Sequence, residues 1–337
     1  MAPQPTTRRV TRADVARYAG VSTAVVSYVV NDGPRPVAAA TAARVREAME
    51  VLQYRPNLSA RALVSGTSNT IGLILADSLN PHCAELALAI GEAASLNGDR
   101  VLVADSRGVD ETEQALVEEL LARQVDGLLF ASTFAHTDPL AGIRSFGVPT
   151  VLIDCPGPVP ERATVGPDAE QGMNDLVEHL AVVHGKRKIA LILGEGGFGN
   201  PDPRETAWRR YQWSHRLDEG ALIVTQWGTA GGYQAGRELL ALPERPDAVV
   251  AGSDMMALGL LRALHEAGVG VPSDLPVVSF DGTRQSEYAW PPLTVCSQPV
   301  AAMAQAAVDL IDNAPLVPGH HTFPMDLIVR SSCGCNP

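Results

Sequence analysis

The first clear pattern of apolar positions runs over residues 11–31 and predicts two short helices joined by a tight turn. Five small apolar side chains are spaced so that they can pack between these helices: Val15, Ala16, Val21, Val26 and Val29. Thr11 can cap the first helix, with Asp14 completing a near-match to a capping box. Gly20 permits the turn, and Ser22 can cap the second helix.

The same spacing leaves one outer face on the second helix, formed by Thr23, Ala24, Ser27, Tyr28 and Asn31. Small polar and methyl-bearing side chains on such a face can approach base edges in the major groove of DNA. The pattern predicts either a helix-turn-helix or an ordinary helical hairpin of a globular domain. By itself it leaves both interpretations open.

Two further helical segments follow this pair. Residues 38–53 carry apolar side chains at helical spacing, although Ala38 at the start offers no capping side chain. Residues 56–64 begin with Pro and are followed by Gly66, which suits a helix of only about two turns. Helices shorter than ~12–15 residues are marginal in water. The segment 56–64 therefore needs a partner to become helical, which makes it a candidate conformational switch.

From residue 71 onward, apolar β-rich runs alternate with helix-like stretches. The predicted strands are Ile71–Ala76, Val101–Ala104, Gly127–Ala131, Thr150–Ile153, Ile189–Leu193, Leu222–Thr225, Ala248–Ala251 and Val277–Phe280. The helix-like stretches between them include Glu85–Leu96, Glu111–Arg123, Asp168–Val183, Tyr233–Leu242, Met255–Glu266 and Val300–Ile311. This alternation predicts parallel sheets with helices on both faces, and so many strands favour two doubly wound halves.

Composition and charge divide the chain into two unlike parts. A length of 337 residues with 46% apolar and 19% charged residues indicates a globular protein of more than one domain and excludes a disordered one. The net charge is −12, but residues 1–65 hold nine Arg and four acidic residues, so this part is basic and the remainder strongly acidic. A basic N-terminal module on an acidic body suits a phosphate-binding headpiece on a sensor or an enzyme.

The five cysteines are scattered along the chain: Cys83, Cys155, Cys296, Cys333 and Cys335. Their spacing is not that of a zinc finger, and the Cys333-Gly-Cys335 pair lacks a second pair, so we expect reduced thiols, no metal site and no cofactor. We expect the adjacent His320 and His321 to lie in a surface loop. The N-terminal residues lack the apolar region of a signal peptide, and no apolar run is long enough to span a membrane. We therefore expect a cytoplasmic protein with no membrane partner.

Carboxylates follow several of the predicted strands: Asp77, Asp105, Asp154 and Asp281, with Ser253-Asp254 after another. Ligands of open parallel sheets bind outside the carboxyl ends of the strands. A cleft lined by carboxylates can accept hydrogen bonds from a hydroxyl-rich ligand such as a sugar or nucleoside. We also expect about half of these Asp residues, Asp254 especially, only to cap the next helix.

Taken together, these features resemble the LacI/GalR family of bacterial transcription regulators, and the similarity extends over residues 10–330. The headpiece landmarks are Asp14-Val-Ala, Ala19-Gly-Val-Ser22, Val26-Ser27, Asn31 and Tyr54-Arg-Pro-Asn57. The core landmarks include Asn80-Pro81, Val125-Asp-Gly-Leu128, Val151-Leu-Ile-Asp154, Asp254-Met-Met-Ala-Leu-Gly259, Phe280-Asp281 and Gln298-Pro299. Many independent short matches in the right order make this resemblance specific.

The resemblance implies an α/β fold: a small all-α helix-turn-helix headpiece on a periplasmic-binding-protein-like core of two doubly wound parallel-sheet subdomains. The expected division is a disordered N-terminus over 1–9, a DNA-binding headpiece over 10–55, a hinge helix and linker over 56–66, and a core over 67–332. Within the core, the N-subdomain would take 67–165 and 296–322, and the C-subdomain 166–295 and 323–332.

The resemblance further implies a homodimer that binds pseudo-palindromic double-stranded operator DNA. The implied DNA-contacting residues are Thr11, Ser22, Thr23, Ala24, Val25, Ser27, Tyr28, Asn31, Tyr54, Asn57, Ala60 and Leu63. Leu63 matches the leucine that wedges between base pairs in the minor groove, a role that fits an apolar side chain. Tyr28 and Val25 replace the residues usual at these positions of the reading helix, so the operator is expected to differ from the family's usual one.

The resemblance also implies that operator affinity is controlled by a small-molecule effector, a sugar or sugar derivative, bound in the core cleft. The implied effector-binding residues are Asp281, Arg204, Asp154, Trp227, Ser253, Phe280 and Asn80. Repression is the expected mode, and a dimer is favoured over a tetramer because no heptad pattern follows Arg330.

Two rival interpretations fit the residues less well. Residues 194–199 fit the dinucleotide pattern G-x-G-x-x-G, but Pro201 and Pro203 follow where a helix should begin. We therefore interpret this run as a Gly-rich cleft loop and do not expect an enzyme. A periplasmic binding protein would share the core fold, but the basic headpiece and the missing signal peptide argue against it.

Overall fold

The structure of the protein, a computed structural model, describes residues 10–30, 33, 35–55, 66–131, 148–155, 157–195, 202–313 and 315–336. Two compact units divide the chain, Met1–Ser68 and Asn69–Pro337. The disordered terminus predicted for residues 1–9 and the hinge helix predicted for residues 56–64 lie outside the described residues.

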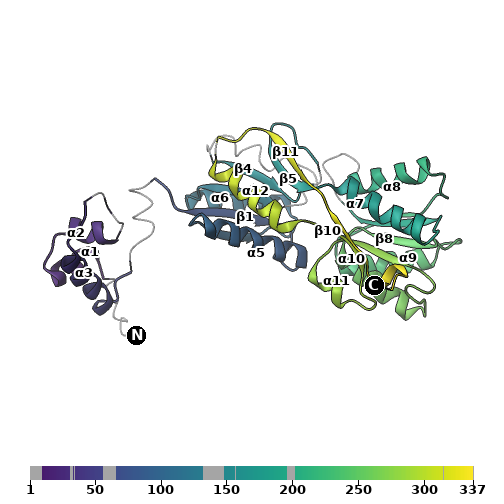
Figure 1. Cartoon of the computed structure of the whole chain (residues 1–337), viewed down its shortest axis with the longest axis horizontal. Coiled ribbons are helices and arrows are strands. Elements are labelled where there is room, and N and C mark those ends of the chain that lie inside the picture. Colours follow the sequence, from purple (N-terminus) through teal and green to yellow (C-terminus); the bar gives the residue numbers. More distant parts are fainter. Residues whose placement is uncertain are drawn as a thin grey trace. The chain divides into compact units, whose positions relative to one another are not determined.

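The described residues of the N-terminal unit form three helices: α1 (Arg12–Ala19), α2 (Thr23–Val30) and α3 (Ala39–Val51) (Figure 1). The start of α1 is a full capping box, because Thr11 and Asp14 each accept a hydrogen bond from the other's backbone N–H. Gly20 ends α1 with a left-handed φ of 67°, and the Ser22 hydroxyl accepts a hydrogen bond from the Val25 N–H. The turn and both caps predicted for the helix pair are thus confirmed.

The core of this unit is small and built from short side chains. Its fully buried members are Val15, Ala16, Ala19, Val26, Val45 and Ala48. Val21 and Val29 pack against this cluster, as predicted for the space between α1 and α2. The side chain of Ala38 makes no capping hydrogen bond, so α3 begins without the polar cap that most helices use.

The second unit contains two six-stranded sheets among the described residues. The first sheet has the order β11-β5-β4-β3-β1-β2, and all its pairs are parallel. Its strands are β1 (Thr70–Leu75), β2 (Arg100–Asp105), β3 (Gly127–Ala131), β4 (Thr150–Ile153), β5 (Ala163–Pro167) and β11 (Gly319–Phe323). Helices α5 (Pro81–Leu96) and α12 (Val300–Asp312) share one apolar core with this sheet, and α6 (Asp110–Ala122) belongs to another.

The second sheet has the order β12-β10-β9-β8-β6-β7, with an antiparallel pair only between β10 and β12. Its strands are β6 (Ile189–Gly194), β7 (Leu222–Thr225), β8 (Ala248–Ala251), β9 (Val277–Asp281), β10 (Thr294–Ser297) and β12 (Asp326–Ile328). The helices are α7 (Ala169–Glu178), α8 (Pro203–Ser214), α9 (Thr229–Leu240), α10 (Asp254–Glu266) and α11 (Arg284–Tyr288). Helices α7 and α8 share one core with this sheet and α9 and α10 another, so this half is also doubly wound.

The chain passes three times between the two halves: after β5, after β10 and between β11 and β12 (Figure 1). The first connection begins after Pro167, the last residue of β5, and β10 belongs to the second sheet. The sequence-based boundaries, after residues 165, 295 and 322, lie close to these connections. They remain a prediction as domain limits.

The structure corrects the sequence interpretation at several short strands. All eight predicted strands are present, but β5, β10, β11 and β12 were not predicted. Polar, Gly or Pro residues interrupt β5 (Ala-Thr-Val-Gly-Pro) and β10 (Thr-Val-Cys-Ser), and β11 carries the polar sequence Gly-His-His-Thr-Phe, so these strands lack an apolar run. His320 and His321 consequently lie in an edge strand and not in a surface loop. No helix within the described ranges is long and apolar enough to cross a membrane.

Candidate functional site

Two carboxylates stand at the carboxyl ends of strands from different sheets. Asp154 follows β4 of the first sheet, and Asp281 ends β9 of the second. Both have a positive φ, 61° for Asp154 and 103° for Asp281. Side chains other than glycine rarely adopt this conformation, and it concentrates at functional sites because surrounding structure must enforce it. The carboxyl ends of strands are also where open parallel sheets bind their ligands.

His82 lies beside Asp154 and close enough to Asp281 to interact with its charge. It is the second residue of α5, and its Nε2 lies 3.0 Å from a carboxylate oxygen of Asp154. Burial alone would lower the pKa of His82, but the charge and hydrogen bond of Asp154, reinforced by Asp281 and Glu85, raise it to about 9. The imidazole is therefore a buried cation at neutral pH. Its position follows from Asn80, whose side chain caps α5 by accepting the His82 N–H.

Asp281 is the more deeply buried carboxylate. The side-chain amide of Gln298 donates to Oδ1 of Asp281 over 3.0 Å. Burial raises the pKa of Asp281 to about 7; His82 opposes this shift, and the charges of Asp254 and Asp154 reinforce it. Near neutral pH this carboxyl group can consequently be present as a proton donor or as an acceptor.

Arg204, in the first turn of α8, is held in one orientation from three sides. Its Nε and Nη2 donate to Asp202 over 2.9 and 2.7 Å, and its Nη1 donates to the Gly252 carbonyl over 2.9 Å. The guanidinium carbon lies 4.9 Å from the centre of the Trp227 ring and 5.3 Å from that of Phe280. Because the guanidinium is already fixed, binding a ligand would cost little additional side-chain conformational entropy.

Trp227 supplies a half-buried aromatic surface beside this guanidinium. Its ring lies against Gly194 at the end of β6, where an added Cβ would come within 2.0 Å of the ring. Glycine is therefore required at position 194 for the indole to lie here. The first glycine of the G-x-G-x-x-G pattern thus has a packing role, whereas positions 196–199 lie outside the described residues.

Other residues predicted for this site serve mainly as local supports. Phe280 is buried beneath the Arg204 guanidinium. The Ser253 hydroxyl accepts the Met256 N–H and so caps α10. The cap predicted for Asp254 is wrong, because this carboxylate instead accepts hydrogen bonds from Ser279 and Thr283 and ties α10 to β9.

Asp77 and Asp105 also make local bonds rather than reaching toward the other carboxylates. Asp77 accepts the Leu79 N–H over 2.9 Å. Asp105 accepts from the backbone of Ser78 and of Arg107. These two agree with the expectation that some strand-end carboxylates only order the following turn.

Sequence reasoning missed His82 and Gln298. Each side chain has a buried polar atom that has no hydrogen-bond partner among the residues the structure describes, Nδ1 of His82 and Oε1 of Gln298. Buried polar atoms are nearly always satisfied, so such atoms next to Asp154 and Asp281 can be satisfied by a bound ligand or water. A polar side chain beside the proline at a helix start was the available signal, since both residues adjoin Pro81 or Pro299.

In the N-terminal unit, the outer face of α2 is accessible as predicted. Thr23 and Ala24 are exposed, and Val25, Ser27 and Tyr28 are partly exposed. The Ser27 hydroxyl accepts a long hydrogen bond, 3.4 Å, from Arg12 of α1. Tyr54 packs partly against the headpiece core. The remaining predicted DNA contacts, Asn31, Asn57, Ala60 and Leu63, lie outside the described residues.

Comparison with known proteins places both units in one family. Residues 11–57 match "Bacterial regulatory proteins, lacI family", and residues 177–333 match "Periplasmic binding protein-like domain". The Ribose operon repressor of Escherichia coli (strain K12) is 31% identical over 307 residues, which cover 89% of this chain and 92% of that protein.

Solved structures agree with this match over almost the whole chain. The Lac repressor dimer bound to operator and the anti-inducer ONPF is 30% identical, with a TM-score of 0.84, and the match covers 97% of this chain and 99% of that one. The transcriptional regulator CelR in complex with cellobiose is 30% identical, with a TM-score of 0.67 and coverage of 96% and 100%. The chain therefore belongs to the LacI family of bacterial regulators, which are DNA-binding transcriptional regulators and not enzymes.

Proposed function

We propose that this regulator is a cytoplasmic repressor whose homodimer binds a pseudo-palindromic operator, and that a sugar or sugar derivative controls this binding. The observation that carries the proposal is that charged side chains from both halves of the core lie close enough for their charges to interact: His82 and Asp154 from the first half, Arg204 and Asp281 from the second. We call these four residues, with Trp227 beside Arg204, the cleft cluster. Elements of both halves contribute to it, so a ligand held there would contact both and change their relative orientation.

The chemistry of the cleft cluster matches that of a sugar. Asp154 and Asp281 can accept hydrogen bonds from ring hydroxyls, and Arg204 can donate to them. The Trp227 indole offers a flat apolar surface for the carbon face of a pyranose or furanose ring. The relatives whose names or titles mention ribose or cellobiose support a sugar over other hydroxylated ligands.

The DNA-binding part of the proposal rests on α2. Its outer residues are small and accessible, which suits close approach to base edges. Two copies of the headpiece would read two half-sites, as the operator-bound Lac repressor dimer supports. The effector would act through the segment 56–64, whose short length makes its helical state depend on DNA and partner contacts.

A thermal-shift screen of sugars, nucleosides and nucleobases tests the effector. A ligand that binds the folded chain raises its melting temperature by mass action. We expect a sugar or sugar derivative to raise the melting temperature of the wild-type chain and to lose this effect in Asp281→Asn. A shift with nucleobases alone, or an equal shift in the variant, would contradict the proposed ligand class or site.

Selection from a random pool of DNA duplexes tests the operator. We expect enrichment of a pseudo-palindrome that binds with a steep salt dependence, because Arg contacts release counterions. Ala24→Glu, on the outer face of α2, should weaken binding by about 10–100-fold, the cost of a wrong contact with a base pair.

Ala40→Glu is the matched control, because it adds the same charge at an exposed position of α3. It should change binding by no more than a few-fold. Equal losses in both variants would show that net charge and not α2 determines binding.

A further inference from the structure

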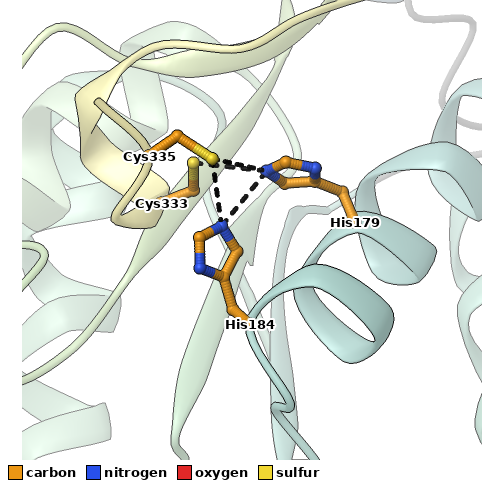
Figure 2. A group of neighbouring side chains, drawn as sticks. All are labelled: His179, His184, Cys333 and Cys335. Carbon is orange, nitrogen blue, oxygen red and sulfur yellow. Dashed lines mark hydrogen bonds between the residues drawn. The ribbon is translucent and has the colours of Figure 1, made fainter. Parts of the chain in front are cut away.

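Two histidines that follow α7 meet two cysteines of the C-terminal segment. This Cys/His cluster consists of His179, His184, Cys333 and Cys335 (Figure 2). Figure 2 shows the two imidazoles coming from the end of α7 and the two sulfurs from the C-terminal segment, with all four ligand atoms directed at a common point. These atoms all lie within 4.8 Å of one another.

Four of the separations between ligand atoms in the Cys/His cluster are close to those of a tetrahedral metal site. Zinc bonds of about 2.3 Å to sulfur and about 2.0–2.1 Å to nitrogen require corners about 3.3 Å apart for two nitrogens and about 3.6 Å apart for nitrogen and sulfur. The two imidazole Nε2 atoms lie 3.3 Å apart. Nε2 of His179 lies 3.3 Å from Cys333 Sγ and 3.7 Å from Cys335 Sγ, and His184 Nε2 lies 3.4 Å from Cys335 Sγ.

The backbone is shaped to bring the two histidines together. Residues 179–183 form a π-helical turn that continues α7, with His179 as its first residue and His184 directly after it. Residues five positions apart in an α-helix are rotated by about 140° about the axis. The wider π turn reduces this rotation, and such turns occur frequently at functional sites.

The second half of the cluster is equally well fixed. Cys333 ends the short 3₁₀-helix Ser331–Cys333. The Thr294 hydroxyl, on β10, lies 3.1 Å from Cys333 Sγ and also accepts the Arg330 N–H. Groups that hydrogen-bond a metal ligand orient it and are a regular part of metal sites. Cys333 is fully buried and Cys335 is half-buried, so the cluster is largely shielded from solvent.

We propose that the Cys/His cluster is a structural zinc site that fastens the C-terminal segment to the end of α7. Two thiolates and two imidazoles in a tetrahedron are the donor set of structural zinc and exclude magnesium and calcium, which take oxygen ligands. Four protein ligands leave no open position, so the site stabilises the fold and does not perform catalysis.

The site links residues more than 150 positions apart, so a metal bound there would stabilise the folded chain through a long loop closure.

Cobalt binding to the full chain, with any affinity tag removed and thiols kept reduced, tests the proposal. We expect the metal-stripped protein to take up one Co²⁺ per chain with the visible bands of tetrahedral cobalt and a thiolate charge-transfer band. One equivalent of Zn²⁺ should displace it. A wild-type chain that gives no thiolate charge-transfer band, or that forms a Cys333–Cys335 disulfide in preference to binding metal, would overturn the proposal.

Matched variants locate the metal. Cys335→Ser changes a half-buried thiol and should weaken Co²⁺ binding by more than about 100-fold, beyond the loss seen when a group supporting a ligand is removed. Cys155→Ser is its control, since that thiol donates to the Gly157 carbonyl in the other half of the core and a hydroxyl can do the same.

His184→Ala should likewise lose the metal, and the exposed His265→Ala should keep it. Cobalt bands that persist unchanged in Cys335→Ser and His184→Ala would place the metal elsewhere and overturn the assignment. The wild-type spectrum decides the question by itself if a variant fails to fold.

Discussion

The cleft cluster and the Cys/His cluster are both groups of titratable side chains in the core, yet they are organised in opposite ways. The cleft cluster mixes charges of both signs, and Nδ1 of His82, next to two strained carboxylates, is a buried polar atom without a hydrogen-bond partner in the described part of the chain. The Cys/His cluster consists of imidazoles and thiols alone, and four of the distances between its ligand atoms are 3.3–3.7 Å. The difference is the one expected between the exchangeable-ligand site that we propose for the cleft cluster and the permanent ion that we propose for the Cys/His cluster.

The largest expected effect within the cleft cluster comes from Arg204→Ala. This change leaves Asp202, whose side chain is only 14% exposed, as a buried carboxylate without its cation. We expect the free energy of unfolding to fall by about 3–5 kcal/mol in denaturant titrations. Arg210→Ala, on the same helix but with a pair more than 40% exposed, should cost less than about 1 kcal/mol. Equal losses of unfolding free energy in the two variants would mean that the Arg204–Asp202 ion pair does not stabilise the cluster.

The next effect is a pH dependence of stability that depends on His82. The pKa of His82 is about 9 in the folded chain, above its ordinary value of 6.5. Its contribution to the free energy of unfolding is therefore full below pH 6.5 and is lost as the pH rises to about 9. That contribution is at most roughly 3 kcal/mol. The free energy of unfolding should fall less steeply with rising pH in His82→Gln than in the wild type. The exposed His265→Gln should retain the wild-type slope. Identical slopes in all three proteins would contradict a charged His82.

A smaller effect is expected on effector affinity in Asp281→Asn. Loss of one hydrogen bond to a charged group costs about 1.5–3 kcal/mol, or about 10–150-fold in affinity by calorimetry. Because the pKa of Asp281 is about 7, wild-type affinity should fall as the pH drops below 7 and the carboxylate becomes protonated. Affinity in the variant should be independent of pH in this range. An equal loss of effector affinity with falling pH in both proteins would show that Asp281 does not contact the effector.

The smallest effect tests whether the two clusters are independent. His184→Ala removes a ligand of the Cys/His cluster, which shares no residue with the cleft cluster. Effector affinity in this variant should stay within about twofold of wild type, since distant sites without shared partners behave additively. A larger change would show that the C-terminal segment takes part in effector binding.

The sequence predicted those features that depend on interactions between residues close together in the chain. The caps of Thr11 and Ser22 and the turn at Gly20 are local, and they were predicted correctly. The eight strands with apolar runs were also found, and their order implied the carboxyl-end location of Asp154 and Asp281. The polar β11 was missed because a strand at a sheet edge needs no apolar run.

The Cys/His cluster could not be read from spacing in the same way. Its halves are more than 150 residues apart, and a search for paired cysteines finds only one pair. Two histidines five positions apart point in different directions on an ordinary α-helix. The π turn brings them to the same side, but no sequence pattern predicts such a turn. For His82, the decisive fact is the approach of Asp154 from a strand 72 positions away.

The positive φ angles at Asp154 and Asp281 would limit how new effector specificity evolves at the binding site that we propose. Asn and Gly occupy such backbone positions readily, whereas β-branched residues do so at a high cost in strain. A change from carboxylate to amide would thus alter the ligand's hydrogen-bonding partner with no rebuilding of the loop. Paralogues and laboratory variants with new inducers are accordingly expected to exchange Asp for Asn at these two positions first, and to vary Trp227 more freely.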